Sequence, residues 1–110
     1  ELFKACDLVV CRAGHGTIMK AIAFGKPMIL IPIPDHTEQY GNARQVMRLG
    51  FGKVLDQHKV NPENLKQIIS EVLDSDKFAD RAREMSLFSE RLNTVCDVVE
   101  LILDRIHRGM

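Results

Sequence analysis

The fold is decided by the stretch LVVCRAGHGTIMKAIAFG, residues 8–25. It opens with the apolar run Leu8 to Cys11, which is short and continuous, as in parallel strands covered on both faces. A helical spacing of apolar residues follows from Thr17 to Phe24, and Gly25 predicts its end. A strand that leads through a glycine-rich turn into a helix predicts a parallel α/β layer.

The same order of elements repeats downstream. Residues 28–33 form a second apolar run, residues 38–49 a helical pattern that stops at Gly50, and residues 53–55 a weaker third strand. We expect this helix to bury one apolar face, made of Tyr40, Ala43, Val46 and Met47.

The second half of the sequence is helical throughout. Asn61 suits a helix cap, and an apolar stripe follows over residues 65–73. A further helix is capped by Ser75 or Asp76, and a last helix carries apolar residues at helical spacing over 92–106. We therefore expect an α/β fold: a partial Rossmann-like domain with a short parallel sheet of about three strands, flanking helices and a helical C-terminal tail.

Composition limits the possible functions. The chain has 110 residues, 45% of them hydrophobic and 27% charged, which fits one globular domain. Its net charge is zero, which argues against a general nucleic-acid binder. No apolar run approaches the length of a membrane span. Three cysteines are an odd and sparse set, which indicates a reducing, cytoplasmic compartment rather than a disulfide framework.

The predicted sheet is thin, because doubly wound domains usually have about five or six strands. The sequence also begins almost directly on the buried-looking run of residues 7–11. We therefore expect residues 1–110 to form a single, truncated domain. Its earlier strands are then missing or supplied by another part of the parent protein.

The main candidate site is the segment Arg12-Ala13-Gly14-His15-Gly16-Thr17. It follows a predicted parallel strand, and open α/β sheets bind ligands at the carboxyl ends of their strands. A glycine-rich turn that enters a helix exposes backbone N–H groups, which together with the helix dipole form an anion site. Arg12 and His15 add donors, and Thr17 adds a hydroxyl that is also able to cap the helix. The segment predicts a phosphate or diphosphate site, and the alternative is a plain tight turn.

Other readings of this region fit less well. Gly14 and Gly16 match two glycines of a dinucleotide fingerprint, but Met19 stands at the third, and no P-loop Gly-Lys-Ser/Thr follows. The spacing of Cys11, His15 and His36 matches no usual zinc pattern, so no metal is expected. We interpret Cys11 as a buried strand cysteine rather than an activated thiol.

A second candidate site follows the second apolar run, at the same edge of the sheet. Glu38 and Gln39 are adjacent there, at the start of a helix. A carboxylate and an amide together suit sugar hydroxyls, which both donate and accept hydrogen bonds. The alternative is an acid placed in a first helical turn, where the dipole favours it.

Three blocks of the sequence carry a family resemblance: DLVVCRAGHGT (7–17), AIAFGKPMILIPIP (21–34) and EQYGNARQVMRLGFGKVL (38–55). They resemble the C-terminal, donor-binding domain of GT-B glycosyltransferases, in particular glycosyltransferase family 28 with the bacterial peptidoglycan UDP-N-acetylglucosamine transferases. The resemblance covers about half of the chain. The helical tail fits the usual end of such a domain but carries no motif.

The resemblance implies roles for the candidate residues. Gly14 to Thr17 would hold the donor diphosphate, and Arg12 stands where plant and animal relatives commonly have a His that faces the phosphate. Glu38 and Gln39 would contact the transferred sugar. Asn42 matches a recurrent Asn that supports the helix and loop. The donor usually binds without a structural metal in this fold, so neither a metal nor a cofactor is expected.

Lys20 departs from the family pattern. The family usually has a Glu at this position, where it holds both ribose hydroxyls, whereas a Lys donates but does not accept. Lys20 remains a candidate donor-binding residue. Three explanations stay open: a different donor nucleotide, a compensating acceptor elsewhere, or a degenerate donor site.

The resemblance implies the donor-binding half of an enzyme that moves a sugar, N-acetylglucosamine from UDP-N-acetylglucosamine, to an acceptor hydroxyl. Its partners would be the UDP-sugar, an acceptor-binding N-terminal domain or partner subunit, and a lipid-linked acceptor at the inner face of the membrane. We expect no catalytic residue in this chain and no activity from it alone. The alternative is a non-catalytic nucleotide-sugar-binding or regulatory module with a degenerate donor site.

Two further alternatives have less support. A sugar-nucleotide 2-epimerase shares the GT-B fold, but its catalytic acids have no evident counterpart, and the missing third glycine disfavours a dehydrogenase. On the last helix, Val98 and Leu101 lie off the apolar stripe. They indicate either an exposed patch that meets a partner domain or ordinary core packing.

Overall fold

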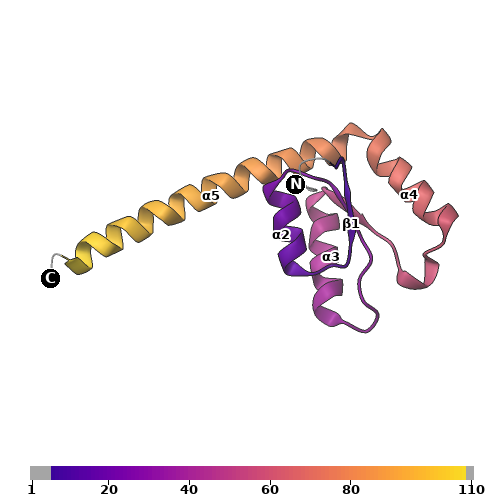
Figure 1. Ribbon diagram of the computed structural model, residues 1–110, viewed down its shortest axis with the longest axis horizontal. Coiled ribbons are helices and arrows are strands. Elements are labelled where there is room, and N and C mark those ends of the chain that lie inside the picture. The colour runs from indigo at the N-terminus through magenta and orange to yellow at the C-terminus, as the bar shows by residue number, and fades with distance from the viewer. Residues whose placement is uncertain (1–5, 109–110) are drawn as a thin grey trace.

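The computed structural model describes residues 6–108, with side chains described up to Leu92 (Figure 1). Three short parallel strands form one sheet in the order β1-β2-β3. The elements in chain order are β1 (Val9–Cys11), α2 (His15–Ala23), β2 (Met28–Leu30), α3 (Thr37–Leu49), β3 (Gly52–Val54), the 3₁₀-helix η1 (Gln57–Lys59), α4 (Pro62–Asp74) and α5 (Asp76–Arg108). The expected α/β fold is confirmed.

Helices cover both faces of the sheet. On one face α2, α3 and the first turns of α5 pack over Met28 and Leu30 of β2, while on the other α4 packs over Ile29. Burial on both faces explains why β2 is a continuous apolar run rather than an alternating one. The two clusters contain the buried residues Ala13, Ile18, Ala21, Met28, Leu30, Ala43, Val46, Phe51 and Ala82 on the first face, and Ile29, Ile68, Val72 and Phe78 on the second.

The central strand is shorter than its apolar run predicts. The run continues to Ile33, but β2 ends at Leu30, and only the N–H of Ile31 still donates to β1. Pro32 and Pro34 have no N–H to give to a neighbouring strand, so the ladder does not continue. The chain therefore leaves the sheet early and forms a loop at the carboxyl ends of the strands.

The expected apolar face of α3 is only half correct. Ala43 and Val46 are buried, but Tyr40 is 43% exposed and Met47 54% exposed. A sheet of three short strands gives the helix a narrow contact stripe. Residues on its flanks therefore stay at the surface.

The helical tail is one helix, where the sequence predicted two. No Gly or Pro occurs from Asp76 to Arg108, so nothing in the sequence ends the first of them. The C-terminal half of α5 extends beyond the α/β body in Figure 1, and the molecule measures 63 × 31 × 26 Å. Val98 and Leu101 lie outside the described side chains, so their expected patch stays a prediction.

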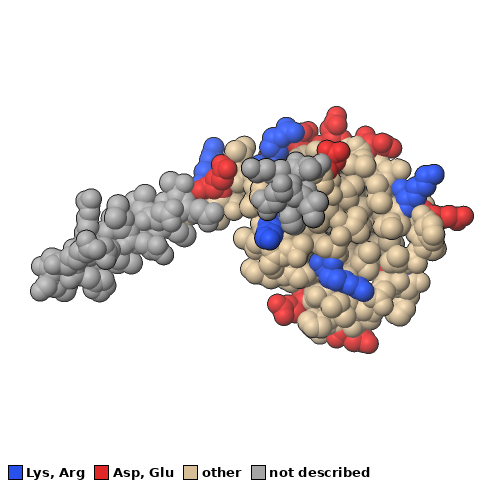
Figure 2. Space-filling model, in the orientation of Figure 1, with Lys and Arg blue, Asp and Glu red and all other residues tan. Residues whose placement is uncertain are grey.

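The surface carries charges of both signs. Acidic and basic side chains are interspersed on the described part of the face shown in Figure 2, without a broad field of either sign. This distribution agrees with the zero net charge of the chain. Among the described helices, none combines the length and the apolar character of a bilayer-crossing segment.

Candidate functional site

The N-terminus of α2 has no side-chain cap. Gly14 occupies the cap position with extended backbone (φ −76°, ψ 139°), and no side chain accepts from the first turn. The first bond of the helix joins the N–H of Ile18 to the carbonyl of Gly14 at 3.1 Å. In the described part of the chain, no acceptor takes the N–H groups of His15, Gly16 or Thr17. Such groups at a helix N-terminus suit an anion.

The sequence suggested that Thr17 caps the helix, but in the structure it does not. The helix begins two residues earlier, at His15, so Thr17 is its third residue. The glycines leave the turn open, since a Cβ at Gly14 or Gly16 would meet nothing within 4 Å. A ligand is therefore able to approach the backbone closely.

Asn42 holds this turn from the side of α3. Its Nδ2 donates to the carbonyl of Ala13 at 2.9 Å, across 29 residues of sequence. Asn42 and His15 also line one groove of about 220 Å³ between α2 and α3. The contact gives Asn42 the helix-to-loop support that its sequence position suggested.

Arg12 points along the ends of the strands. Its Nη1 donates to the Ile31 carbonyl at 3.2 Å and to Gln57 Oε1 at 2.6 Å. These contacts join residues that follow β1 and β2 to η1, which follows β3. The sequence analysis missed Gln57, although its place just after the third strand puts it at the carboxyl edge of the sheet.

Glu38 and Gln39 lie in the first turn of α3, at the same edge. Gln39 Oε1 accepts from the N–H of Ile33 at 3.0 Å. This bond fixes the amide and leaves its NH₂ group for another acceptor. Glu38 is exposed, and the cap residue His36 makes no side-chain bond to the helix. A carboxylate and an oriented amide donor are thus available beside the loop.

Lys20 lies on α2, one turn beyond Thr17, and its side chain is exposed. The candidate residues therefore come from two helices that both begin at the carboxyl edge. The glycine turn, the start of α2 and the start of α3 are brought to that edge by the parallel topology.

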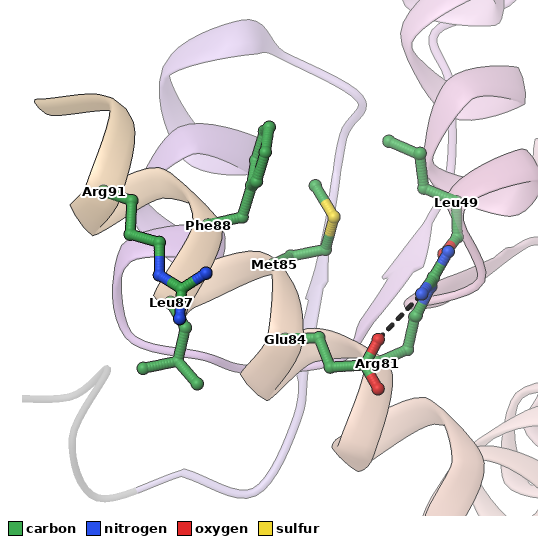
Figure 3. A pocket seen from close by; sticks show the side chains of 7 residues that line it. All are labelled: Leu49, Arg81, Glu84, Met85, Leu87, Phe88 and Arg91. Atoms are coloured by element: carbon green, nitrogen blue, oxygen red, sulfur yellow. Dashed lines mark hydrogen bonds and ion pairs between the residues drawn. The ribbon is translucent and has the colours of Figure 1, made fainter. Parts of the chain in front are cut away.

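A more voluminous groove of the described residues lies elsewhere. It has a volume of about 610 Å³ and is lined by Leu49, Arg81, Glu84, Met85, Leu87, Phe88 and Arg91 (Figure 3). Leu49 ends α3, at the opposite edge of the sheet from Gly14. There Arg81 Nε donates to the Leu49 carbonyl at 2.7 Å, and its Nη1 pairs with Glu84. The first contact fastens α5 to α3 and the second lies within α5, so Arg81 has a structural role.

Metal ligands do not gather within the described residues, where no group of three His, Cys, Asp or Glu side chains comes together. Cys11 is half-buried, and this burial raises the pKa of its thiol to about 11. The reading of Cys11 as an inert strand cysteine agrees with this direction, because an activated thiol needs a lowered pKa.

Cys11 is expected to resist alkylation. With a pKa of about 11 only about one thiol in a thousand is ionised at pH 8, against about one in ten at the ordinary value of 9.0. Peptide mapping after iodoacetamide at pH 8 should show modification of Cys11 about a hundredfold slower than in the urea-unfolded chain, and its rate should rise about tenfold per pH unit up to pH 10. Because the folded pKa lies above the unfolded value of 9.0, stability should fall as the pH rises from 9.0 to about 11. Rapid labelling at pH 8 would contradict the assignment.

The fold is that of the C-terminal domains of GT-B glycosyltransferases. Residues 1–100 match the glycosyltransferase family 28 C-terminal domain, and the chain belongs to this family. It is similar to an uncharacterised glycosyltransferase of Methanosarcina mazei, with 33% identity over 97% of this chain and 28% of the relative.

Two further relatives have more specific names. The UDP-N-acetylglucosamine–N-acetylmuramyl-(pentapeptide) pyrophosphoryl-undecaprenol N-acetylglucosamine transferase of Rhizobium etli is 36% identical over 93% of this chain and 29% of the relative. The spinosyn rhamnosyltransferase SpnG, solved with thymidine diphosphate, is 30% identical, with a TM-score of 0.68 over 76% of this chain and 22% of that one. The chain thus spans less than a third of the length of these relatives.

Proposed function

We propose that residues 1–110 form the donor-binding domain of a glycosyltransferase that uses a nucleoside-diphosphate sugar, UDP-N-acetylglucosamine by preference. The observation that carries the proposal is the uncapped N-terminus of α2, which presents free N–H groups behind an open glycine turn. A diphosphate is the anion that best fits both the family relationship and the free N–H groups at the start of α2.

The proposed mechanism is electrostatic. As the sugar leaves the diphosphate, negative charge grows on the phosphate oxygens, and fixed N–H donors at Gly14 to Thr17 stabilise that charge without moving. His15, which begins α2, adds a side-chain donor. Glu38 and Gln39 hold the sugar hydroxyls, and the Gln39 amide is already oriented by Ile33. No residue of this chain is assigned as the catalytic base.

The choice of a nucleoside-diphosphate sugar as donor rests on two relatives, and the preference for UDP-N-acetylglucosamine rests on the first of them. The name of the Rhizobium protein specifies UDP-N-acetylglucosamine, and SpnG was solved with thymidine diphosphate. The Rhizobium name also specifies a lipid-linked acceptor, and we propose a similar acceptor, bound by a domain or subunit outside residues 1–110. The isolated chain should then bind the donor but release no product.

The test is a titration of the isotope-labelled chain with UDP, UDP-N-acetylglucosamine, GDP and TDP, followed by backbone amide shifts. We expect nucleotide-dependent shifts at Gly14 to Thr17 and shifts at Glu38 and Gln39 only when the sugar is present. Equal shifts with UDP and UDP-N-acetylglucosamine at Glu38 would overturn the sugar assignment. Shifts confined to residues away from the carboxyl edge would overturn the site.

The presence of Lys20 favours the second candidate, a non-catalytic module with a degenerate donor site. If Lys20 instead serves the diphosphate, Lys20→Glu replaces a cation by an anion near it and should weaken UDP binding by about fivefold to tenfold. Calorimetric titration measures this, with Lys26→Glu, beyond the end of the same helix, as the control. Stronger UDP binding by Lys20→Glu would support the degenerate donor site.

A further inference from the structure

We infer that Arg12 and Gln57 form a strand-end bridge that holds the turn 12–17 in shape for its ligand, and that Gln57 is a positioning residue of the donor site. The bridge consists of the Arg12 guanidinium, the Ile31 carbonyl and the Gln57 side chain. The ligand in this inference rests on the proposed function. The support that the bridge gives to the turn is measurable without any ligand.

The bridge spans all three strands. Arg12 directly follows β1, Ile31 directly follows β2, and Gln57 opens the helix that follows β3. A single nitrogen, Nη1, reaches both acceptors, at 3.2 Å and 2.6 Å. A charged donor makes these stronger than bonds between neutral groups. The first residue of the turn is thereby tied to a part of the chain 45 residues away.

Gln57 is a well-placed anchor, because several bonds fix η1. The N–H of Leu55 donates to the Leu30 carbonyl at 2.9 Å, which continues the sheet up to the helix. Asp56 Oδ1 caps η1 by accepting from the N–H of His58 at 2.8 Å. Asn64 Nδ2 donates to the Lys59 carbonyl at 2.7 Å and ties the other end to α4. The Gln57 backbone therefore has little freedom to follow Arg12.

The turn needs such support. Two of its six residues are glycines, which lose more conformational freedom on ordering than other residues, and neither has a neighbour within 4 Å of a Cβ position. Within the described residues three long-range side-chain hydrogen bonds reach it: Asn42 to Ala13 on the side of α3, and Arg12 to both Ile31 and Gln57 on the other side. A turn held at both sides presents its N–H groups without an ordering cost when the anion binds.

The bridge also gives Arg12 a different role from the one that the resemblance implied. With its guanidinium on Ile31 and Gln57, Arg12 acts on the diphosphate through the shape of the turn rather than by direct contact. If Arg12 left Gln57 to meet the phosphate, removal of Gln57 would free it and strengthen binding. The two roles therefore predict opposite effects of Gln57→Ala.

The experiment compares three variants of the full 110-residue chain. Gln57→Ala removes the acceptor, Gln57→Glu keeps an acceptor for Arg12, and His58→Ala is the matched control on the same exposed helix. Thermal unfolding checks that each is folded. Backbone ¹⁵N order parameters of Ala13 to Thr17 report the ordering of the turn without a ligand, and calorimetric titration with UDP reports the site.

We expect Gln57→Ala to lower the order parameters of Ala13 to Thr17 and to weaken UDP binding by about threefold to tenfold, the range of one exposed hydrogen bond. Gln57→Glu should restore both, and His58→Ala should match the wild type. Unchanged order parameters at the turn, a fall spread over the whole sheet, or tighter UDP binding by Gln57→Ala would each overturn the inference. Lower order parameters at the turn in a Gln57→Ala chain, when the wild type binds no UDP, support the bridge and reject the proposed function instead.

Discussion

Gly52→Ala should destabilise the chain by about 3 kcal/mol, a large share of the stability of a small domain. Gly52 is buried at the start of β3, opposite Met28 of the central strand. A Cβ there would lie 2.6 Å from Val46 Cγ1 and 2.7 Å from the Met28 carbonyl oxygen. The side chain of Val46 has little room to turn away in the core, and the carbonyl belongs to the sheet backbone. Relief therefore requires β3 to move away from β2.

Urea unfolding followed by circular dichroism measures the effect, and the midpoint should fall by about 2 M at an m-value of about 1.5 kcal/mol per M. The matched control is Gly41→Ala on the exposed face of α3, where a Cβ meets nothing within 4 Å. Since Gly is a poor helix former, this variant should gain about 0.5–1 kcal/mol. A Gly52→Ala chain as stable as the wild type would mean that α3 does not pack against β3 as the structure has it.

The strands and helices were largely predictable because their signals are local. Gly50 ends α3 with φ 85°, and Asn61 caps α4 by accepting from the Asn64 N–H at 2.8 Å. The failures occur where a longer-range condition decides. The exposure of Tyr40, for example, depends on the width of the sheet. The end of β2 is a different case, because Pro32 and Pro34 mark it locally and the apolar run was followed past them.

The candidate site was predictable only as a set of strand-to-helix turns. The parallel order brings Gly14 and Glu38 to one edge, and this follows from the pattern of elements alone. Gln57 was missed because its partner Arg12 is 45 residues away, and no local pattern marks such a pair. The uncapped start of α2 was missed because Thr17 is a good cap residue by type, whereas the helix begins two residues before it, at His15.

Gly14→Asp should make the chain more stable and abolish most of its nucleotide binding. Gly14 has φ −76°, which any L-residue adopts, and an open position for a Cβ. An Asp side chain there is able to accept from the free N–H groups of Gly16 or Thr17 and places a negative charge at the positive end of the helix. Together these should add about 0.5 kcal/mol to the free energy of unfolding. The same carboxylate occupies the donors and repels a diphosphate, so UDP affinity should fall by about a hundredfold.

Gly14→Asn separates the two causes of that loss, because it caps about as well as Asp but carries no charge. If occupied N–H groups and charge repulsion both matter, UDP should bind Gly14→Asn about tenfold less tightly than the wild type, but still more tightly than Gly14→Asp. Calorimetric titration and urea unfolding of the three chains give affinity and stability from the same samples. Wild-type affinity in Gly14→Asp would mean that the diphosphate does not bind at the start of α2. If the Gly14 variants are more stable than the wild type but bind UDP more weakly, the missing cap is the feature that leaves room for the ligand.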